Sequence, residues 1–224
     1  MNSDGELSRT TCAIMTRLLV IDAFPIWREG IKAVLSGDRD IEFLLEFPDA
    51  GNVQEKVMNH GADLAVLDVE VPMGDGFEIL NLLRRLDDSL PILVFTRFPE
   101  NLYGVRALKE GAAGYLTKAA TSQELVKAVD MIRAGRKYIS DGLSQRLASY
   151  VQGGKNLLPH DRLSSREFEV MLLLAEGMTP KEVSDKLSLS YTTVTAHKIH
   201  ILSKMGLRSL SELTKYVITE KLTN

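Results

Sequence analysis

The sequence has little cysteine, few aromatic residues and no long hydrophobic run. Cys12 is its one cysteine, which excludes an internal disulfide and a zinc site built from cysteines. No stretch approaches the ~18 uninterrupted apolar residues needed to cross a bilayer. The first fifteen residues contain acidic and polar side chains, where a secretory signal needs basic and then apolar ones. We therefore expect a cytoplasmic protein with no membrane partner.

The overall composition is ordinary for a globular chain, with 45% hydrophobic and 25% charged residues among 224. This disfavours disordered and collagen-like classes, and the length suits two small domains or one large one. The net charge is −3. Within this acidic protein, the segment Tyr191–Gly206 contains lysines and histidines but no acid. Such a local basic segment points to a polyanionic partner.

The chain before residue 140 alternates short apolar runs with amphipathic segments of helical period. The expected strands are Leu18–Ile21, Ile41–Phe47, Leu64–Leu67, Ile92–Phe95 and Gly114–Leu116. The expected helices are Ile26–Leu35, Val53–Asn59, Phe77–Leu86, Tyr103–Lys109 and Leu125–Ile132. This alternation is typical of βαβ units and of a parallel sheet covered on both faces. It predicts a doubly wound, flavodoxin-like (βα)5 domain.

The end of the chain predicts a small all-α domain of four helices. Three capping boxes and one further serine cap mark the helix starts: Ser164-x-x-Glu167, Thr179-Pro180-x-Glu182, Ser209-x-x-Glu212 and Ser190. Only Ser188–Ser190 separates the second helix from the third. A connection this short predicts a helix-turn-helix.

Four polar residues stand where predicted strands end: Asp22, Asp68, Thr96 and Lys118. Ligands of doubly wound sheets bind beyond these strand ends. Two carboxylates at the same edge of a sheet repel each other unless a cation or a proton lies between them. Mg²⁺ is the cation that usually binds such carboxylates. A hydroxyl and a lysine beside them suit the acceptance of a phosphoryl group, which depends mainly on positioning and charge neutralisation.

The motifs resemble those of a known family over nearly the whole chain. Asp68-x-x-x-Pro72-x-x-Asp75-Gly76, Thr96 and Gly111–Lys118 resemble the receiver domain of bacterial two-component response regulators. The C-terminal motifs resemble the LuxR-type helix-turn-helix: Leu163-Ser164-x-Arg166-Glu167, Glu176-Gly177, Lys181-Glu182-Val183, and Thr193-Val194 with His197 and Leu202-x-Lys204-Met205-Gly206. Together they resemble the NarL/FixJ type, with a receiver at 16–138, a linker at 139–160 and a DNA-binding domain at 161–224. A helix from about Leu143 to Tyr150 is expected in the linker.

The resemblance implies roles for the strand-end residues. Asp68 would be the phosphoacceptor, Thr96 the switch hydroxyl and Lys118 the lysine that pairs with the phosphate. Asp22 would belong to the acidic pocket, and Glu70 would offer its backbone carbonyl to a metal. A sensor histidine kinase would be the partner that supplies the phosphoryl group.

One departure from the family concerns the metal. The family usually has two adjacent acids after the first strand, whereas this chain has Asp22-Ala23 followed by Phe24. The missing carboxylate is the one that normally binds Mg²⁺ directly, and ligand charge sets the affinity for a hard cation. We therefore expect only a weak Mg²⁺ site at Asp22, Asp68 and Glu70, and impaired phosphorylation of Asp68.

The third helix of the C-terminal domain is expected to enter the DNA major groove. Nine residues are predicted to contact DNA: Lys181, Thr192, Thr193, Thr195, Ala196, Lys198, Ile199, His200 and Lys204. Thr195 can donate a hydrogen bond or present its methyl group, and Lys198 can reach guanine or phosphate. His197 either contacts phosphate or lies half-buried against the domain.

A homodimer is expected because one small module makes few phosphate contacts, and pairing modules on two half-sites raises affinity and specificity. The resemblance makes the helix at Ser209–Glu220 the dimer surface of the DNA-binding domain. Two other interpretations stay open at this point. The protein could be a conventional phosphorylation-switched regulator that tolerates Ala23. Alternatively, the first domain could be a ligand- or protein-binding flavodoxin-like module that controls the helical domain. No nucleophile set or metal-ligand spacing indicates an enzyme, and Asp22–Ile26 lacks a glycine-rich nucleotide loop.

Overall fold

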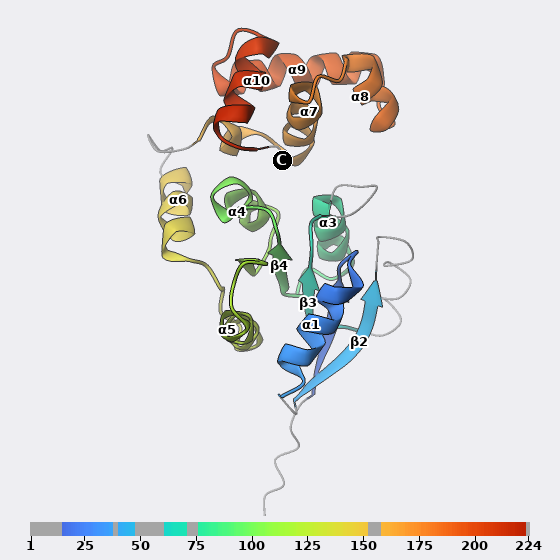
Figure 1. Ribbon diagram of the computed structural model, residues 1–224, viewed down its shortest axis with the longest axis vertical. Helices are drawn as coiled ribbons and strands as arrows, with labels where there is room; N and C mark the ends of the chain where they lie inside the picture. Colours follow the sequence, from blue (N-terminus) through green and yellow to red (C-terminus); the bar gives the residue numbers. More distant parts are fainter. Residues whose placement is uncertain (1–14, 38–39, 48–60, 71–75, 152–157, 223–224) are drawn as a thin grey trace, which may run out of the picture.

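The computed structural model describes residues 15–37, 40–47, 61–70, 76–151 and 158–222. Within them, parallel strands form one sheet in the order β2-β1-β3-β4-β5 (Figure 1). The strands are β1 (Thr16–Ile21), β2 (Ile41–Phe47), β3 (Leu64–Leu67), β4 (Ile92–Thr96) and β5 (Gly114–Thr117). Each expected strand is confirmed, with ends that differ by at most two residues.

Helices cover both faces of the sheet, as a doubly wound fold requires. They are α1 (Pro25–Leu35), α3 (Gly76–Leu86), α4 (Glu100–Lys109) and α5 (Ser122–Arg133). Alternate residues of β1 serve two separate cores: Leu18 and Val20 pack with the side chains of α1 and α5, and Leu19 and Ile21 pack with those of α3 and α4. The expected helix Val53–Asn59 lies outside the described residues.

The strand order places two carboxylates side by side. β1 and β3 are adjacent, and Ile21 pairs with Leu67 at their ends. The next residues along the chain, Asp22 and Asp68, therefore leave the sheet as neighbours. The start of α3 closes tightly against the same loop, because a Cβ at Gly76 would lie 2.3 Å from the Val69 backbone. Only glycine fits such a close approach.

A helix expected in the linker is confirmed as α6 (Asp141–Val151), which lies beside α4 (Figure 1). Leu143 of α6 is fully buried, and its methyl groups would lie 2.9 Å from a Cβ at Gly104. The absence of a side chain at Gly104 thus lets the two helices pack closely.

The C-terminal domain begins with a 3-10 helix, η1 (Pro159–Arg162), followed by four helices. These are α7 (Ser165–Ala175), α8 (Pro180–Lys186), α9 (Tyr191–Met205) and α10 (Leu210–Thr219). No helix of the described residues is long and apolar enough to cross a membrane. The helix-turn-helix formed by α8 and α9 confirms the predicted architecture.

Three of the four predicted helix caps have the expected geometry. Ser164 and Thr179 form reciprocal capping boxes with the glutamates three residues later, and Ser190 accepts from the Thr193 amide. The fourth prediction is half wrong. Ser209 accepts from the Glu212 amide, but the Glu212 carboxylate accepts instead from the amide of Arg208 at 2.7 Å. The extended backbone of Ser209 brings the preceding amide into reach.

The two domains meet where α4 faces η1 and α7 (Figure 1). The Tyr103 ring lies 5.2 Å from the Phe168 ring at an interplanar angle of 71°. The Arg106 guanidinium lies 3.7 Å from the Phe77 ring of the receiver and 5.3 Å from the Phe168 ring. Lys109 Nζ donates to the Asp161 carbonyl at 3.2 Å. The buried core thus continues from the receiver into the helical domain.

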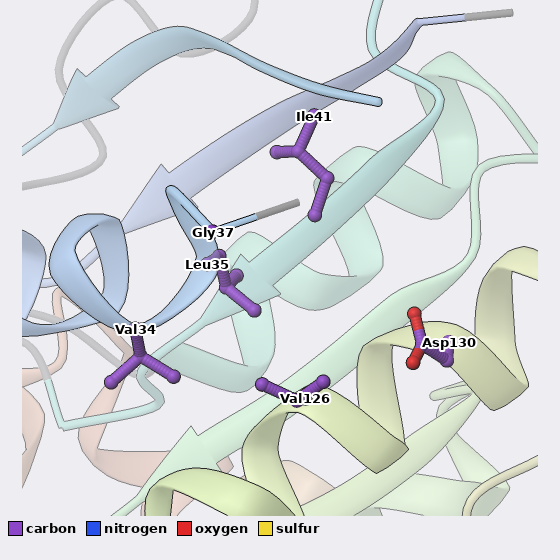
Figure 2. A pocket seen from close by; sticks show the side chains of 6 residues that line it. All are labelled: Val34, Leu35, Gly37, Ile41, Val126 and Asp130. Atoms are coloured by element: carbon purple, nitrogen blue, oxygen red, sulfur yellow. The ribbon is translucent and has the colours of Figure 1, made fainter. Parts of the chain in front are cut away.

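A hollow at the opposite edge of the sheet from Asp22 and Asp68 lies between α1 and α5. Figure 2 shows its lining: Val34, Leu35, Gly37, Ile41, Val126 and Asp130. Its walls are mainly aliphatic with a single carboxylate, so it offers none of the chemistry expected at the strand ends.

Candidate functional site

The four strand-end residues are all buried at the C-terminal edge of the sheet. Asp22, Asp68, Thr96 and Lys118 are at most 8% exposed. They follow or end β1, β3, β4 and β5, and the Lys118 amide donates to the Thr96 carbonyl at 2.8 Å. Charged side chains this deep in a protein need partners, and here they provide them for one another.

Lys118 bridges the two carboxylates. Its Nζ lies 2.5 Å from Oδ2 of Asp68 and 2.6 Å from Oδ2 of Asp22. The contact with Asp68 is an aligned hydrogen bond, whereas that with Asp22 is a charge contact without hydrogen-bond alignment. One ammonium thus neutralises one of two buried carboxylates and leaves an excess negative charge.

The other oxygen of each carboxylate is held by the local backbone. Oδ1 of Asp22 accepts from the Phe24 amide at 2.8 Å, and Oδ1 of Asp68 accepts from the Glu70 amide at 2.9 Å. Both are turns in which an aspartate bonds to the amide two residues on. Burial raises the pKa of Asp22, against the opposing effects of Lys118 and the Phe24 amide.

An aromatic and charged rim covers this cluster. Lys118 Nζ lies 4.9 Å from the Trp27 ring and 5.7 Å from the Phe24 ring. Arg97 donates to the Glu70 carboxylate at 2.7 Å, and its guanidinium lies 5.9 Å from the Phe24 ring. The hydrogen bond from Arg97 lowers the pKa of Glu70. Sequence reasoning missed Trp27, which lies on α1 away from the strand ends, and Arg97, which directly follows Thr96 but belongs to none of the quoted motifs.

The donor set suits a divalent cation poorly. Mg²⁺ requires near-octahedral oxygen ligands and usually a pair of carboxylates, but both carboxylates here already contact Lys118, and Ala23 adds no oxygen. Among the described residues, no group of three or more acidic, histidine or cysteine side chains is placed to bind a metal. Lys118 Nζ already lies within 2.6 Å of an oxygen of each carboxylate.

A switch-like hydroxyl and a tyrosine flank the loop after β4. The Phe98 amide lies 3.5 Å from Oγ1 of Thr96, and the Tyr115 hydroxyl donates to the Phe98 carbonyl at 2.9 Å. Tyr115 is fully buried, and burial raises its pKa. The Phe98 ring stacks on Tyr103 at a centroid distance of 4.5 Å. A continuous chain of contacts therefore runs from Thr96 to the contact between α4 and the helical domain.

The second candidate site, on α9, lies on the part of the helical domain turned away from the receiver (Figure 1). Val194, Ile201 and Met205 are buried and face the domain core. The predicted contact residues lie outside this core: Lys181, Thr192, Thr193, Ala196, Ile199, His200 and Lys204 are exposed, and Thr195 and Lys198 are half-exposed. In this arrangement the receiver leaves the helix open to a ligand.

Several of these side chains already have partners within the domain. Thr195 Oγ1 donates to the Tyr191 carbonyl at 2.9 Å, and the Thr193 hydroxyl lies 2.7 Å from that of Ser190. Lys204 Nζ donates to the Glu167 carboxylate at 2.6 and 2.8 Å. Although burial opposes it, the pKa of Glu167 is lowered, mainly by this bond. Sequence reasoning treated Lys204 as available and Glu167 only as a capping residue, and it missed the pairing of the two.

The comparisons with known proteins identify both domains. Residues 18–130 match the family described as response regulator receiver domain. Residues 161–217 match bacterial regulatory proteins of the luxR family. The chain belongs to the NarL/FixJ-type response regulators, the DNA-binding transcription regulators of two-component systems.

Curated relatives are similar over almost their whole length. The chain is 32% identical to the Fimbriae Z protein of Salmonella typhimurium over 207 residues, covering 92% of this chain and 97% of that protein. It is 31% identical to the oxygen regulatory protein NreC of Staphylococcus aureus over 215 residues, covering 92% and 98%.

Solved structures share the two-domain architecture. RcsB of Salmonella enterica serovar Typhimurium, bound to promoter rprA with the phosphomimetic BeF₃⁻, matches with a TM-score of 0.70 and 25% identity over 90% of this chain and 98% of that one. An RcsB–DNA complex matches with a TM-score of 0.59 and 25% identity over 91% and 98%.

Proposed function

We propose that this protein is a homodimeric regulator that binds double-stranded DNA through α9, and that its receiver accepts phosphate poorly. The observation that carries the DNA part is that the predicted contact residues of α9 are exposed or half-exposed, whereas the opposite side of the helix is buried. The RcsB structures, solved on DNA, support the same mode of docking for this chain.

The contact residues divide by chemistry. Thr192, Thr195, Ala196 and Ile199 are proposed to face the bases. Lys181, Lys198 and His200 are proposed to contact phosphate, with Thr193 at the positive N-terminus of α9. Lys204 is proposed to reach phosphate only after leaving Glu167, because its ammonium is already paired.

Salt-dependent affinity tests the DNA part. Each lysine that neutralises a phosphate contributes about one unit to the slope of log affinity against log salt. Lys181→Glu and Lys198→Glu should therefore weaken binding and lower the slope, and Lys127→Glu on the exposed side of α5 is the matched control. If the first two variants kept the DNA affinity and the salt slope of the wild type, the proposed contact of this helix-turn-helix with DNA would be wrong.

Two features support poor phosphorylation. Lys118 contacts both Asp22 and Asp68, and Ala23 provides no carboxylate. Attack on a phosphodonor needs the Asp68 oxygen that now bonds to Lys118, and the carboxylate that would bring a metal is missing. DNA binding would then be constitutive or controlled in another way. The second candidate, a conventional switch, is favoured by the presence of Asp68, Thr96 and Lys118 at matching strand ends. It would take its phosphoryl group from a sensor histidine kinase.

Labelling with a small phosphodonor separates these two functions. Acetyl phosphate with Mg²⁺ should label the full chain slowly or not at all and should leave its DNA affinity unchanged. Efficient labelling that disappears in Asp68→Asn, with a rise in affinity, would establish the conventional switch. A phosphorylatable receiver of known activity, treated in parallel, controls for the donor.

Dimerisation is proposed to use the helix at Ser209–Glu220, observed as α10 with Ser209 as its cap. Leu213 and Val217 are buried in the domain, whereas Ile218 is 66% exposed. A large exposed apolar side chain on an otherwise polar face suits a contact between two copies that meet on adjacent half-sites.

A further inference from the structure

The outward side of α9 has an unusual chemical composition for a helix that reads DNA. Four residues form this side, which we call the groove face: Thr192, Thr195, Ala196 and Ile199. Thr192 lies three and four positions before Thr195 and Ala196, which lie four and three positions before Ile199, so the four side chains adjoin along the helix. The buried residues Val194, Ile201 and Met205 occupy the opposite side. The groove face is therefore the part of α9 that would point into a groove.

The hydroxyl of Thr195 is turned back on its own helix. Its Oγ1 donates to the Tyr191 carbonyl at 2.9 Å, so its proton is not available to an acceptor on a base. The threonine side chain is stiff at χ1, so the groups left to meet a ligand are the methyl and the lone pairs of Oγ1, which can accept but not donate. This excludes donation by Thr195 to a base and favours a contact through its methyl group.

The rest of the groove face is also rich in methyl groups. Ala196 is exposed, and Ile199 is 61% exposed. From Tyr191 to Met205 the helix contains no Arg, Asn, Gln, Asp or Glu, so of the side chains that read bases by hydrogen bonds it keeps only lysine, threonine and serine. The side chains of Lys198 and His200 lie on opposite flanks of the face, as 3.6 residues per turn requires. They are placed for the two phosphate backbones rather than the bases.

We propose that the groove face recognises the C5 methyl groups of thymine, so that each half-site presents thymines in the major groove under α9. The inference rests on the proposed DNA-binding function. Thymine is the base whose major-groove edge carries a methyl group. Burying that methyl against the methyl groups of the helix removes apolar surface from water and favours binding. Guanine presents only acceptors and finds no donor on Thr195, Ala196 or Ile199, so the hydroxyl of the exposed Thr192 is the one donor that the groove face offers.

Replacement of thymine by uracil tests this directly, because it removes the methyl and keeps the pairing. Duplexes bound by the full chain are selected from random DNA, and each thymine of the half-site is replaced in turn by deoxyuridine. Affinity should fall about three- to fivefold for each contacted methyl, the effect of withdrawing one buried methyl group. Thymines outside the half-site should be replaceable without effect.

Variants of one residue type provide the control. Ile199→Ala should lose affinity for the thymine duplex and much less for the uracil duplex, whereas Ile26→Ala, which trims an exposed isoleucine of the receiver, should leave both unchanged. Strong duplex binding with no penalty for uracil, or with equal losses for Ile199→Ala on both duplexes, would overturn the inference while DNA binding stands. A half-site selected without thymine would also overturn it. Enrichment of no duplex at all would overturn the proposed function itself.

Discussion

Tyr103 of the receiver and Phe168 of the helical domain pack with their ring centroids 5.2 Å apart. Tyr103 also stacks on Phe98, two residues after the end of β4, and Phe168 lies 5.9 Å from His160. Aromatic pairs of this kind contribute about 0.5–1.5 kcal/mol beyond the area they bury. The loop after β4 is therefore mechanically connected to the base of the DNA-binding domain.

Arg106 is expected to strengthen this joint, since its guanidinium contacts one ring from each domain, Phe77 and Phe168. Arg106→Met keeps the apolar stem and removes the charge, at a cost of about 1–2 kcal/mol. Thermal unfolding should shift down by roughly 2–8 °C, and small-angle X-ray scattering should show a larger radius of gyration. Arg85→Met, on the exposed side of α3, is the matched control. Equal behaviour of the two variants would mean that Arg106 does not join the domains.

His160 is expected to make the helical domain sensitive to acid. Burial lowers its pKa to about 4 from 6.5, and its Nδ1 lies 2.7 Å from the Tyr216 hydroxyl. Because the folded state prefers the neutral ring, the stabilisation is complete above pH 6.5 and is lost as the pH falls toward 4. The loss amounts to roughly 3 kcal/mol.

Denaturant titrations between pH 7 and pH 4 measure this effect. His160→Gln should flatten the fall in stability over that interval, since it removes the titrating group. Tyr216→Phe removes the hydroxyl and keeps the histidine, so it should lower stability at pH 7 and retain the slope. An unchanged slope in His160→Gln would assign the acid sensitivity to other groups.

Much of the fold was predictable because its signals are local. Short apolar runs separated by amphipathic segments specify the strands, and three of four helix caps depend on residues three positions apart. The exception, Glu212, bonds to Arg208 because of the extended backbone at Ser209, a conformation that the capping pattern does not encode.

The site was predictable only in part. Strand-end positions identified Asp22, Asp68, Thr96 and Lys118, since parallel strands deliver their ends to one edge. The sequence could not show that one ammonium bridges both carboxylates, nor that Trp27 and Arg97 cover it. These contacts depend on how separate loops pack, as does the pairing of Lys204 with Glu167 across 37 residues.

Lys118 is expected to be essential for the stability of the receiver. Removing one partner of a buried ion pair costs about 3–5 kcal/mol, and Lys118→Met would leave Asp22 and Asp68 without a counter-charge. Both carboxyls would then bind protons more tightly, so the variant should regain stability as the pH falls. Chemical unfolding at pH 7 and pH 5 checks this. Adding Asp22→Asn to Lys118→Met should restore part of the lost stability. If Lys118→Met is as stable as the wild type at pH 7, the ion pairs of Lys118 do not stabilise the receiver.

Ile218 is expected to govern pairing of the DNA-binding domains. Ile218→Arg places a charge in the centre of the proposed α10 contact, which two copies would bring together. Binding to a duplex with two half-sites should lose its cooperativity, while affinity for one half-site should stay the same. Lys215→Arg keeps the charge on this helix and is the control. Loss of single half-site affinity in Ile218→Arg would indicate misfolding of the domain instead.

Ala23 is expected to be the residue that limits magnesium binding. Ala23→Asp supplies a second carboxylate beside Asp22, and because ligand charge sets the affinity for a hard cation, Mg²⁺ should bind about tenfold more tightly or better. Trp27 is the one tryptophan of the chain and lies 4.9 Å from Lys118 Nζ, so its fluorescence reports the titration. Ala23→Asn adds similar bulk without charge and should stay near the wild type. The same Ala23→Asp chain should accept phosphate from acetyl phosphate faster. If its affinity for Mg²⁺ stays that of Ala23→Asn, then Lys118, rather than the missing acid, excludes the cation.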